Sequence, residues 1–246
     1  MAHSLALRGW AVTVLDQAEG VGAGASGLPA GLAAPHVSPD DNVLSRITRA
    51  GVRAALQRAE ALLQSGTDWA LSGVLEHNLA GKRRLPTGNA VPEEAQDNAN
   101  ECSTQASAEQ IAAAGLPPET PALWHAQAGW IRPRQLLAAQ LQTPGVQVHW
   151  GRKAHTMARR DGLWLVTDAQ GETLGQAPLL VVASAFDSLA LLRPLPGLAM
   201  PLNPLRGQIS YGHMHTLTDV QRQKLPPFPV NGHGSFITGV PLPGEA

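Results

Sequence analysis

Glycines spaced as Gly-x-Gly-x-x-Gly occupy residues 22–27, directly after the strand-like segment 11–16. In dinucleotide-binding folds such glycines hold a phosphate only when a helix begins immediately after them, because the helix N-terminus supplies the N–H donors and the dipole. Here Pro29, Gly31 and Pro35 follow, and proline removes a backbone donor and clashes inside a helix. The sequence therefore predicts that residues 22–27 are not a phosphate loop.

The residues before these glycines fit a later step of the same fold. Residues 2–8 have helical spacing, Gly9 is placed to end the helix, and the next strand closes with Asp16. A helix, a turn and a strand ending in an acid are the second and third parts of a βαβ unit, where the acid holds ribose hydroxyls. A phosphate-binding G-x-G-x-x-G is then expected just upstream of Met1. The alternative is a complete chain in which Asp16 only caps a turn or a helix.

Composition indicates a globular chain without a strong electrostatic preference. The 246 residues are 43% hydrophobic and 15% charged, which suits one large domain or two small ones. A net charge of −1 gives no global attraction to nucleic acid. Local basic clusters occur at 82–84, at Arg132 and Arg134, and at 152–160. We interpret them as solvated charges, with an RNA-contacting surface as the alternative.

Cysteine and hydropathy exclude several classes of protein. Cys102 is the only cysteine and lies in a polar stretch, so neither a disulfide nor a cysteine-based metal site is predicted. The histidines His213, His215 and His233 lack further ligands nearby in the sequence, so no metal site is predicted there. No apolar run has the length of a membrane span and no signal peptide opens the chain. A cytoplasmic protein without membrane contact is the expectation.

Periodicity and turn residues predict the other elements, and together they favour an α/β (α+β) fold with an inserted antiparallel sheet. Helices are expected within 40–66, with Asp40 or Asp41 as N-cap, within 107–115, and after a turn within 128–142. Strands are expected within 146–160, 162–168, 179–184, 201–211 and 234–241.

Four segments resemble one family in the same order along the chain. They are AHSLALRGWAVTVLDQAEGVGAGASGLPAGLAAPHVSPDDN, GWIRPRQLL, LLVVASAFDS and PLNPLRGQIS. The chain thereby resembles the FAD-dependent oxidoreductases of the D-amino-acid oxidase superfamily, most closely the oxidoreductase half of a bifunctional tRNA-modifying member. The resemblance implies FAD as cofactor and a Rossmann-like FAD-binding domain with an inserted antiparallel substrate domain. It assigns segments 1–80 and 128–190 to the FAD-binding part, and 81–127 and 191–246 to the substrate part.

The resemblance also implies which residues contact FAD. Asp16, with Gln17 beside it, would bind the adenosine ribose, and the small-residue loop after it would follow the flavin side. Small residues let backbone amides approach a ligand closely, although such loops also occur as plain connections. Relatives commonly carry Asn at the position of Leu28, so one polar contact is expected to be absent. The remaining implied contacts are Ala25, Ser26, Gly27, Leu28, Ala30 and Gly31 at the flavin, Lys153 and Ala154 at the adenine, and Ala183, Ser184 and Ala185 at the pyrophosphate.

The C-terminal end departs from the family. Members return to the FAD domain through a glycine-rich turn that closes over the flavin, whereas this sequence ends with GVPLPGEA. With the missing first glycine motif, this leads to the expectation of a fragment that lacks both ends of the cofactor site. Segment 179–184 has a plain alternative too, an ordinary buried strand.

The implied reaction is oxidation of a secondary amine of the type R–CH₂–NH–CH₂–COO⁻ to an imine, which then hydrolyses. In the tRNA-modifying members this removes a carboxymethyl group from the wobble uridine. A carboxylate of this kind calls for an arginine clamp, so Arg206 and Gln208 are the catalytic candidates, unless their strand only organises the sheet. A methyltransferase, fused or separate, is the implied partner. The alternatives are an oxidase of small amines or amino acids, and a truncated chain without cofactor or activity.

Overall fold

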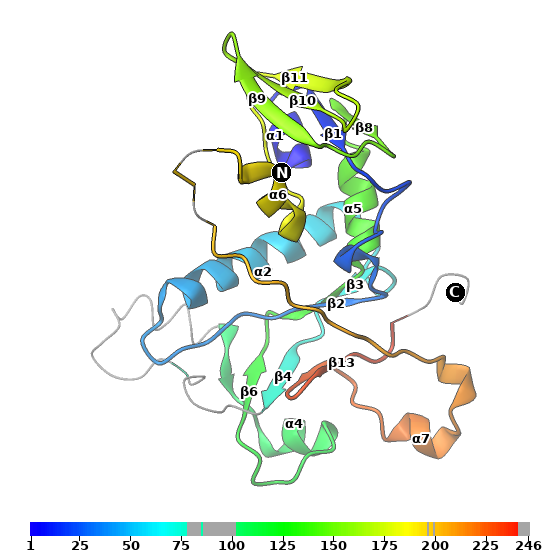
Figure 1. Ribbon diagram of the computed structural model, residues 1–246. Helices are drawn as coiled ribbons and strands as arrows, with labels where there is room; N and C mark the ends of the chain where they lie inside the picture. Colours follow the sequence, from blue (N-terminus) through cyan, green and yellow to red (C-terminus); the bar gives the residue numbers. More distant parts are fainter. Residues whose placement is uncertain (78–84, 86–101, 196, 199, 241–246) are drawn as a thin grey trace. The chain divides into compact units, whose positions relative to one another are not determined.

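A computed structural model describes residues 1–77, 85, 102–195, 197, 198 and 200–240. The backbone forms two compact units (Figure 1), which we call unit 1 and unit 2. Unit 1 comprises Met1–Gly27 and Leu137–Ser210, and unit 2 comprises Leu28–Leu136 and Tyr211–Ala246. The predicted domains concern which segments bind cofactor and substrate, and this assignment stays a prediction.

Unit 1 begins with the predicted helix, turn and strand. Helix α1 (Ala2–Ala6) ends before Gly9, whose φ of +85° suits glycine, and β1 (Val12–Leu15) follows. Strand β1 pairs in parallel with β8 (Val146–His149), from Val12 opposite Val146 to Leu15 opposite His149. A parallel pair requires a crossover connection, and here the intervening chain contains the first part of unit 2.

A three-stranded antiparallel sheet follows in unit 1, in the order β11-β10-β9. Asp161 and Gly162 both have positive φ, 49° and 81°, as a two-residue hairpin between β9 and β10 requires. The sequence predicted one strand within 146–160, which the structure divides into β8 and β9, and it predicted β10. The third strand was not predicted, since its segment TLGQA lacks a run of β-branched residues. The bounds are β9 (Thr156–Arg160), β10 (Leu163–Thr167) and β11 (Thr173–Ala177).

The strand predicted within 179–184 is wrong. These residues belong to none of the strands in the described part of the chain, and a single-turn helix η2 (Ala185–Asp187) and α6 (Ser188–Leu192) follow them. Leu179 and Val181 are 47% and 44% exposed, so the alternative of an ordinary buried strand is also wrong. Apolar β-branched residues favour a strand, but only a neighbouring strand can complete it.

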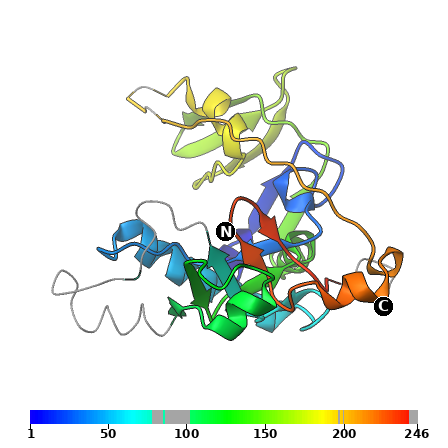
Figure 2. The ribbon, with the colours of Figure 1, turned by 90° about the horizontal axis from the view of Figure 1, so that it is seen from below.

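Unit 2 contains a five-stranded sheet in the order β13-β12-β4-β6-β5. The β12–β4 pair is parallel and the other pairs are antiparallel; the β12–β13 hairpin, red in Figure 2, lies at one edge. Helix α4 (Ala108–Ala113), predicted from its periodicity, contributes Ile111 to a core with Leu75, Ala122 and Val230. The strand bounds are β4 (Val74–His77), β5 (Thr104–Gln105), β6 (Ala122–His125), β12 (Val230–Asn231) and β13 (Ser235–Phe236).

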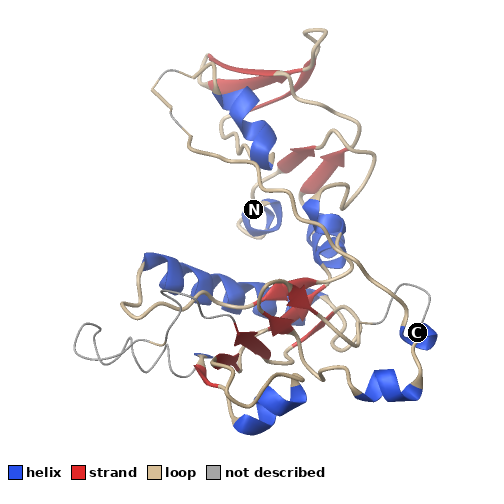
Figure 3. Ribbon diagram, turned by 60° about the horizontal axis from the view of Figure 1, so that its bottom comes forward, coloured by secondary structure: helices blue, strands red, loops and turns tan. Residues whose placement is uncertain are grey.

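A second sheet of unit 2 has the order β2-β7-β3 and packs on the long helix α2 (Val43–Leu62), as Figure 3 shows. Leu56 and Ala59 of α2 meet Ile131 of β7 in this core. The turn predicted before the next helix is wrong, because strand β7 leads directly into α5 (Pro133–Leu141), whose first residue is a favourable N1 proline. The bounds are β2 (Gly31–Ala33), β3 (Trp69–Ala70) and β7 (Gly129–Ile131).

Helix α2 is capped by a different residue from the one predicted. Asn42 Oδ1 accepts a hydrogen bond from the N–H of Ser45 at 3.1 Å, so the N-cap is neither Asp40 nor Asp41. Asp41 instead has a φ of +43° and forms a buried ion pair with Arg49, which lies about two turns into the helix. The cap prediction failed because Asp41 forms an ion pair with an arginine eight residues along the chain instead of capping the helix.

The strand predicted within 201–211 is also wrong. This stretch has no regular secondary structure, and Leu205 is 98% exposed. Of the strand predicted within 234–241, only the two residues of β13 are strand among the described residues. Between these stretches lie η3 (Met214–Thr216) and α7 (Asp219–Gln223), which Thr218 caps by accepting from the N–H of Gln221. The predicted basic cluster 82–84 lies outside the described residues.

Candidate cofactor site

The turn after β1 is built around Asp16. Its carboxylate oxygen Oδ1 accepts from the N–H of Ala18 at 2.9 Å, a local hydrogen bond typical of aspartate in turns. The N–H of Asp16 donates to the carbonyl of His149 at 3.1 Å, which extends the β1–β8 ladder by one residue. The side chain is exposed at the carboxyl end of a parallel strand, where open α/β sheets bind ligands. That Asp16 accepts from ribose hydroxyls stays a prediction.

The end of β8 is fastened to the same turn. The N–H of Arg152 donates to the carbonyl of Asp16 at 2.8 Å, and the N–H of Gly151 donates to Ala18 at 2.9 Å. Gly151 has a φ of +64°, which favours glycine at this bend. The bend brings the predicted adenine residues Lys153 and its neighbour Ala154 close to the turn that holds Asp16.

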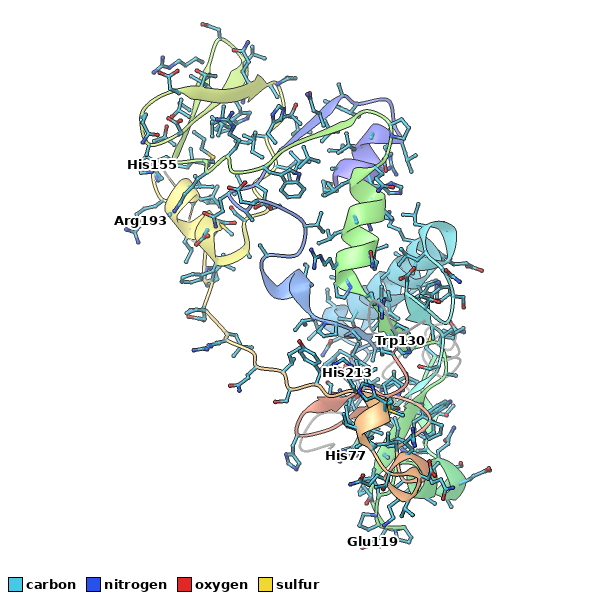
Figure 4. All side chains as sticks on the ribbon, turned by 90° about the vertical axis from the view of Figure 1, so that its right-hand side faces the viewer. His77, Glu119, Trp130, His155, Arg193 and His213 are labelled. Atoms are coloured by element: carbon cyan, nitrogen blue, oxygen red, sulfur yellow. The ribbon has the colours of Figure 1, made fainter. Side chains whose placement is uncertain are left out.

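A cavity of ≈ 350 Å³ in unit 1 has Lys153 in its wall, together with Arg152 and His155. His155 is labelled in Figure 4 just before β9. The acid of this wall, Asp168, accepts from the N–H groups of Gln170 and Glu172, both at 2.9 Å, so it closes a turn. The cations of the cavity wall suit an anionic group.

The segment of the predicted pyrophosphate residues contacts the Asp16 turn through a side chain. Gln17 Nε2 donates to Asp187 Oδ2 at 3.3 Å, across 170 residues of sequence. Asp187 lies just after the predicted pyrophosphate residues Ala183, Ser184 and Ala185. Ala185 has a φ of +49°, a conformation that alanine rarely adopts and that often marks functional sites. The structure thus brings the three segments 16–17, 151–154 and 183–187 together.

The glycine segment forms a tight turn. Gly22 has a φ of +81°, the N–H of Gly27 donates to Gly24 at 2.9 Å, and a Cβ on Gly27 would lie 2.3 Å from the carbonyl oxygen of Gly22. Between the end of β1 and the start of α2 at residue 43, a stretch described throughout, the 3₁₀ turn η1 (Ala25–Gly27) is the one helical element. The prediction that this motif is not a helix-linked phosphate loop is confirmed. Ala25 and Gly24 are exposed, so the backbone here is open to a cofactor, which fits the implied role of Ala25, Ser26 and Gly27.

The continuation of this loop belongs to unit 2. Leu28 and Ala30 are partly exposed, and Gly31 begins β2, where it pairs with Ile131. A Cβ on Gly31 would lie 3.2 Å from Cγ of Pro133, so its small size permits close packing there. Their contacts with FAD stay predictions.

The catalytic candidates Arg206 and Gln208 lie in the exposed, irregular stretch after α6. No hydrogen bond joins them to the residues of the Asp16 turn within the described part of the chain. Their substrate contact stays a prediction. His213 and His215 lie with ring centroids 5.1 Å apart, and among the described residues no group of three or more histidines, cysteines or acids is placed to hold a metal ion.

Unit 2 holds a buried polar network that sequence reasoning missed. His125 on β6 is fully buried, with Nδ1 2.7 Å from Oγ of Ser103 and Nε2 3.1 Å from Oε2 of Glu76. Asn231 Nδ2 donates to the other carboxylate oxygen of Glu76 at 3.3 Å. The network joins β4, β6, β12 and the residue before β5. Its burial keeps substrate away, so its role is to hold the sheet together.

One further residue differs from the sequence prediction. Arg132, interpreted as a solvated charge together with Arg134, is only 7% exposed, whereas Arg134 is exposed as predicted. Periodicity does not reveal this burial, because Arg132 lies between a short strand and a helix. Cys102, for which the sequence predicted neither burial nor exposure, is buried 3.9 Å from Oε1 of Gln127.

Comparison with known proteins identifies the class of enzyme to which this fold belongs. The chain belongs to the FAD dependent oxidoreductase family, whose model matches residues 1–242. This confirms the predicted family, its α/β fold class and FAD as the family's cofactor. The segments around Asp16 fit FAD, because an exposed acid, open backbone and nearby cations are grouped there.

The relatives narrow the comparison further. The chain is similar to the tRNA 5-methylaminomethyl-2-thiouridine biosynthesis bifunctional protein MnmC of Polaromonas naphthalenivorans, with 48% identity over 98% of this chain and 38% of the relative. Similarity to the protein of the same name from Delftia acidovorans is 47%, over 100% of this chain and 39% of the relative. The chain therefore spans less than two-fifths of the length of these relatives.

Solved structures show the fold alone. Glycine oxidase from Geobacillus kaustophilus superposes with a TM-score of 0.62 at 16% identity, over 99% of this chain and 65% of that structure. NikD, an amino acid oxidase of nikkomycin biosynthesis, superposes with a TM-score of 0.51 at 21% identity, over 79% of this chain and 50% of that structure. Among the described residues, no helix is long and apolar enough to cross a membrane.

Proposed function

We propose that this chain is the oxidoreductase part of an enzyme of wobble-uridine modification, which uses FAD to oxidise the secondary amine of a carboxymethylaminomethyl group on tRNA. The observation that carries this proposal is the 48% identity to MnmC across 98% of the chain. A second support is the structure itself, in which the segments that contain Asp16, Lys153 and Asp187 are grouped at the carboxyl ends of β1 and β8.

In this proposal the residues around Asp16 bind and orient the cofactor. Asp16 accepts from ribose hydroxyls, while the open backbone of 23–25 donates N–H groups to polar atoms of FAD. Lys153 and Arg152 offset negative charge of the cofactor from the cavity beside them. Bound FAD supplies the two-electron acceptor that an amine oxidation needs.

The partners follow from the same proposal. The substrate is tRNA, and the exposed arginines Arg159 and Arg160 on β9 are available to phosphates. A methyltransferase, fused or separate, would act on the aminomethyl product, in agreement with the bifunctional relatives. A cytoplasmic location is part of this proposal.

The test is an assay on tRNA that carries the carboxymethylaminomethyl group, with FAD in excess and nucleosides analysed by mass spectrometry. The proposal expects conversion to the aminomethyl nucleoside by the wild-type chain and a strong loss with Asp16→Ala. N-methylglycine as substrate separates the alternative: oxidation of this small amine without conversion of the tRNA would indicate a small-amine oxidase. No turnover of either substrate, by a chain that binds FAD, would contradict the proposal.

A further inference from the structure

A long-range hydrogen bond in unit 1 joins two segments that are predicted to contact FAD. Gln17 follows Asp16 in the turn after β1, and its Nε2 donates to Oδ2 of Asp187 at 3.3 Å. Asp187 ends the single-turn helix η2, in the segment of the predicted pyrophosphate residues. In the described part of the chain, residues 180–192 have no other hydrogen bond to the rest of unit 1. One side-chain contact therefore fastens this segment to the turn of Asp16.

The segment 183–187 depends on such a contact, because its backbone is strained and its side chains are exposed. Ala185 has a φ of +49°, a conformation that alanine rarely adopts. All five residues of the segment are exposed, so packing does little to hold them. A strained residue keeps its conformation only where the contacts around it determine that conformation. The hydrogen bond from Gln17 is the contact in a position to do so.

The carboxylate of Asp187 makes this distant bond in place of a local one. Asp187 is the N-cap residue of α6, where an aspartate ordinarily accepts from an N–H of the first helical turn. Its side chain makes no such capping bond. The next residue, Ser188, is buried, with its Oγ 3.3 Å from Oγ of Ser184. Burial of Ser188 thus anchors one end of the segment, and the bond to Gln17 fixes the exposed end.

The distance between these two segments matters for a ligand that touches both. In FAD the adenosine ribose is joined directly to the pyrophosphate, so the predicted contacts at Asp16 and at residues 183–185 must lie at a fixed separation. A loose segment would have to be ordered during binding, and the lost conformational entropy would weaken the affinity. A segment that is already held at the turn of Asp16 avoids this cost, because the site is formed before the ligand arrives.

We propose that Gln17 and Asp187 are positioning residues, which together form a latch that holds the segment 183–187 in its strained conformation ready for FAD. Gln17 acts through Asp187 in this role, whereas the family resemblance implied a place beside the ribose. Neither side chain has to touch the cofactor. The proposal rests on the predicted contacts of residues 183–185 with FAD, the cofactor of the proposed function, and is independent of which amine is oxidised.

The first test exchanges the two functional groups and measures the Kd for FAD by quenching of flavin fluorescence. Asp187→Ala should raise the Kd about fivefold, and Gln17→Glu, which sets two carboxylates against each other, about tenfold. The double variant Gln17→Glu/Asp187→Asn keeps the net charge and lets the new amide donate to the new carboxylate, so its Kd should return to within about twofold of wild type. Gln147→Glu, at an exposed position on β8, is the control for added charge and should bind FAD as wild type does. A double variant that binds no better than Gln17→Glu alone would overturn the proposal. So would tighter binding by Asp187→Ala, since the acid would then only repel the pyrophosphate.

A second test needs no FAD. The backbone ¹⁵N order parameter of Ala185 is measured by NMR in the FAD-free chain, where the latch should already hold the segment. The proposal expects a high value in wild type, a clear fall with Asp187→Ala and recovery in the double variant. An Ala185 amide that stays equally ordered in Asp187→Ala would overturn the latch alone. FAD binding that follows the latch, without oxidation of the tRNA, would instead contradict the proposed function alone.

Discussion

The backbone N–H of Arg152 donates to the carbonyl oxygen of Asp16 at 2.8 Å, which fastens the bend after β8 to the turn after β1. The whole first segment of unit 2, Leu28–Leu136, lies between the two residues in the sequence. Because the strands are parallel, their carboxyl ends meet, and ligands of open α/β sheets bind at such ends. The candidate cofactor site follows from this pairing.

Gly27→Ala should disrupt the turn before unit 2. Its Cβ would lie 2.3 Å from the carbonyl oxygen of Gly22, and a backbone atom cannot move away cheaply. We expect a loss of stability of about 2 kcal/mol and weaker FAD binding, measured by urea unfolding and by quenching of flavin fluorescence. Gly24→Ala meets nothing within 4 Å and is the control. Equal behaviour of the two variants would contradict the described turn.

Asp41→Ala should strongly destabilise unit 2. Asp41 and Arg49 have side chains only 2% and 11% exposed, so removing the aspartate leaves a guanidinium largely buried without its partner. The expected loss is about 3 kcal/mol in urea unfolding. Glu60→Ala, an exposed acid on the same helix, should cost almost nothing.

The same pair predicts a pH dependence. The hydrogen bond to Asp41 raises the pKa of Arg49 above its usual value, against the lowering effect of burial. A raised pKa of a cation contributes stability that is complete below the unfolded-state pKa and is lost only as pH rises through the folded-state pKa. Deprotonation of Arg49 should therefore not contribute to unfolding between pH 7 and about pH 11. An Arg49-dependent loss of stability in that interval, measured by comparing wild type with Arg49→Met, would contradict this.

Ser103→Ala should destabilise the five-stranded sheet. The change removes the partner of Nδ1 of His125, which is fully buried and has no access to water. We expect a loss of about 1–2 kcal/mol, seen in the midpoint of urea unfolding. Gln105→Ala, on the exposed face of neighbouring β5, serves as the comparison and should stay within about 0.5 kcal/mol of wild type.

Local signals predicted the elements that are stabilised locally. The periodicity of α2 and α4 and the Asp161–Gly162 hairpin lie within short stretches of sequence, so the sequence contains their causes. Residues 179–184 and 201–211 have strand-forming composition but no neighbouring strand in the described part of the chain. Strand formation depends on a partner that is distant in sequence, and composition cannot supply it.

For the candidate cofactor site, the sequence likewise indicated the segments but not the contacts between them. The acid at the end of a strand indicated Asp16, and the family resemblance indicated the segments of Lys153 and Ala185. The Gln17–Asp187 contact spans 170 residues and leaves no local pattern. Arg132 was misjudged because a single arginine next to a short strand looks the same in sequence whether it is buried or solvated.

The most direct measurement is the flavin absorbance of the chain after purification with excess FAD and desalting, for wild type and for Asp16→Ala. Asp16→Asn is the control, because its amide oxygen can still accept from the N–H of Ala18 and close the turn. The account predicts that wild type retains about one equivalent of FAD and that Asp16→Ala loses most of it, because the ribose loses its acceptor. A folded wild-type chain that retains no flavin, or an Asp16→Ala protein that retains as much as wild type, would contradict it.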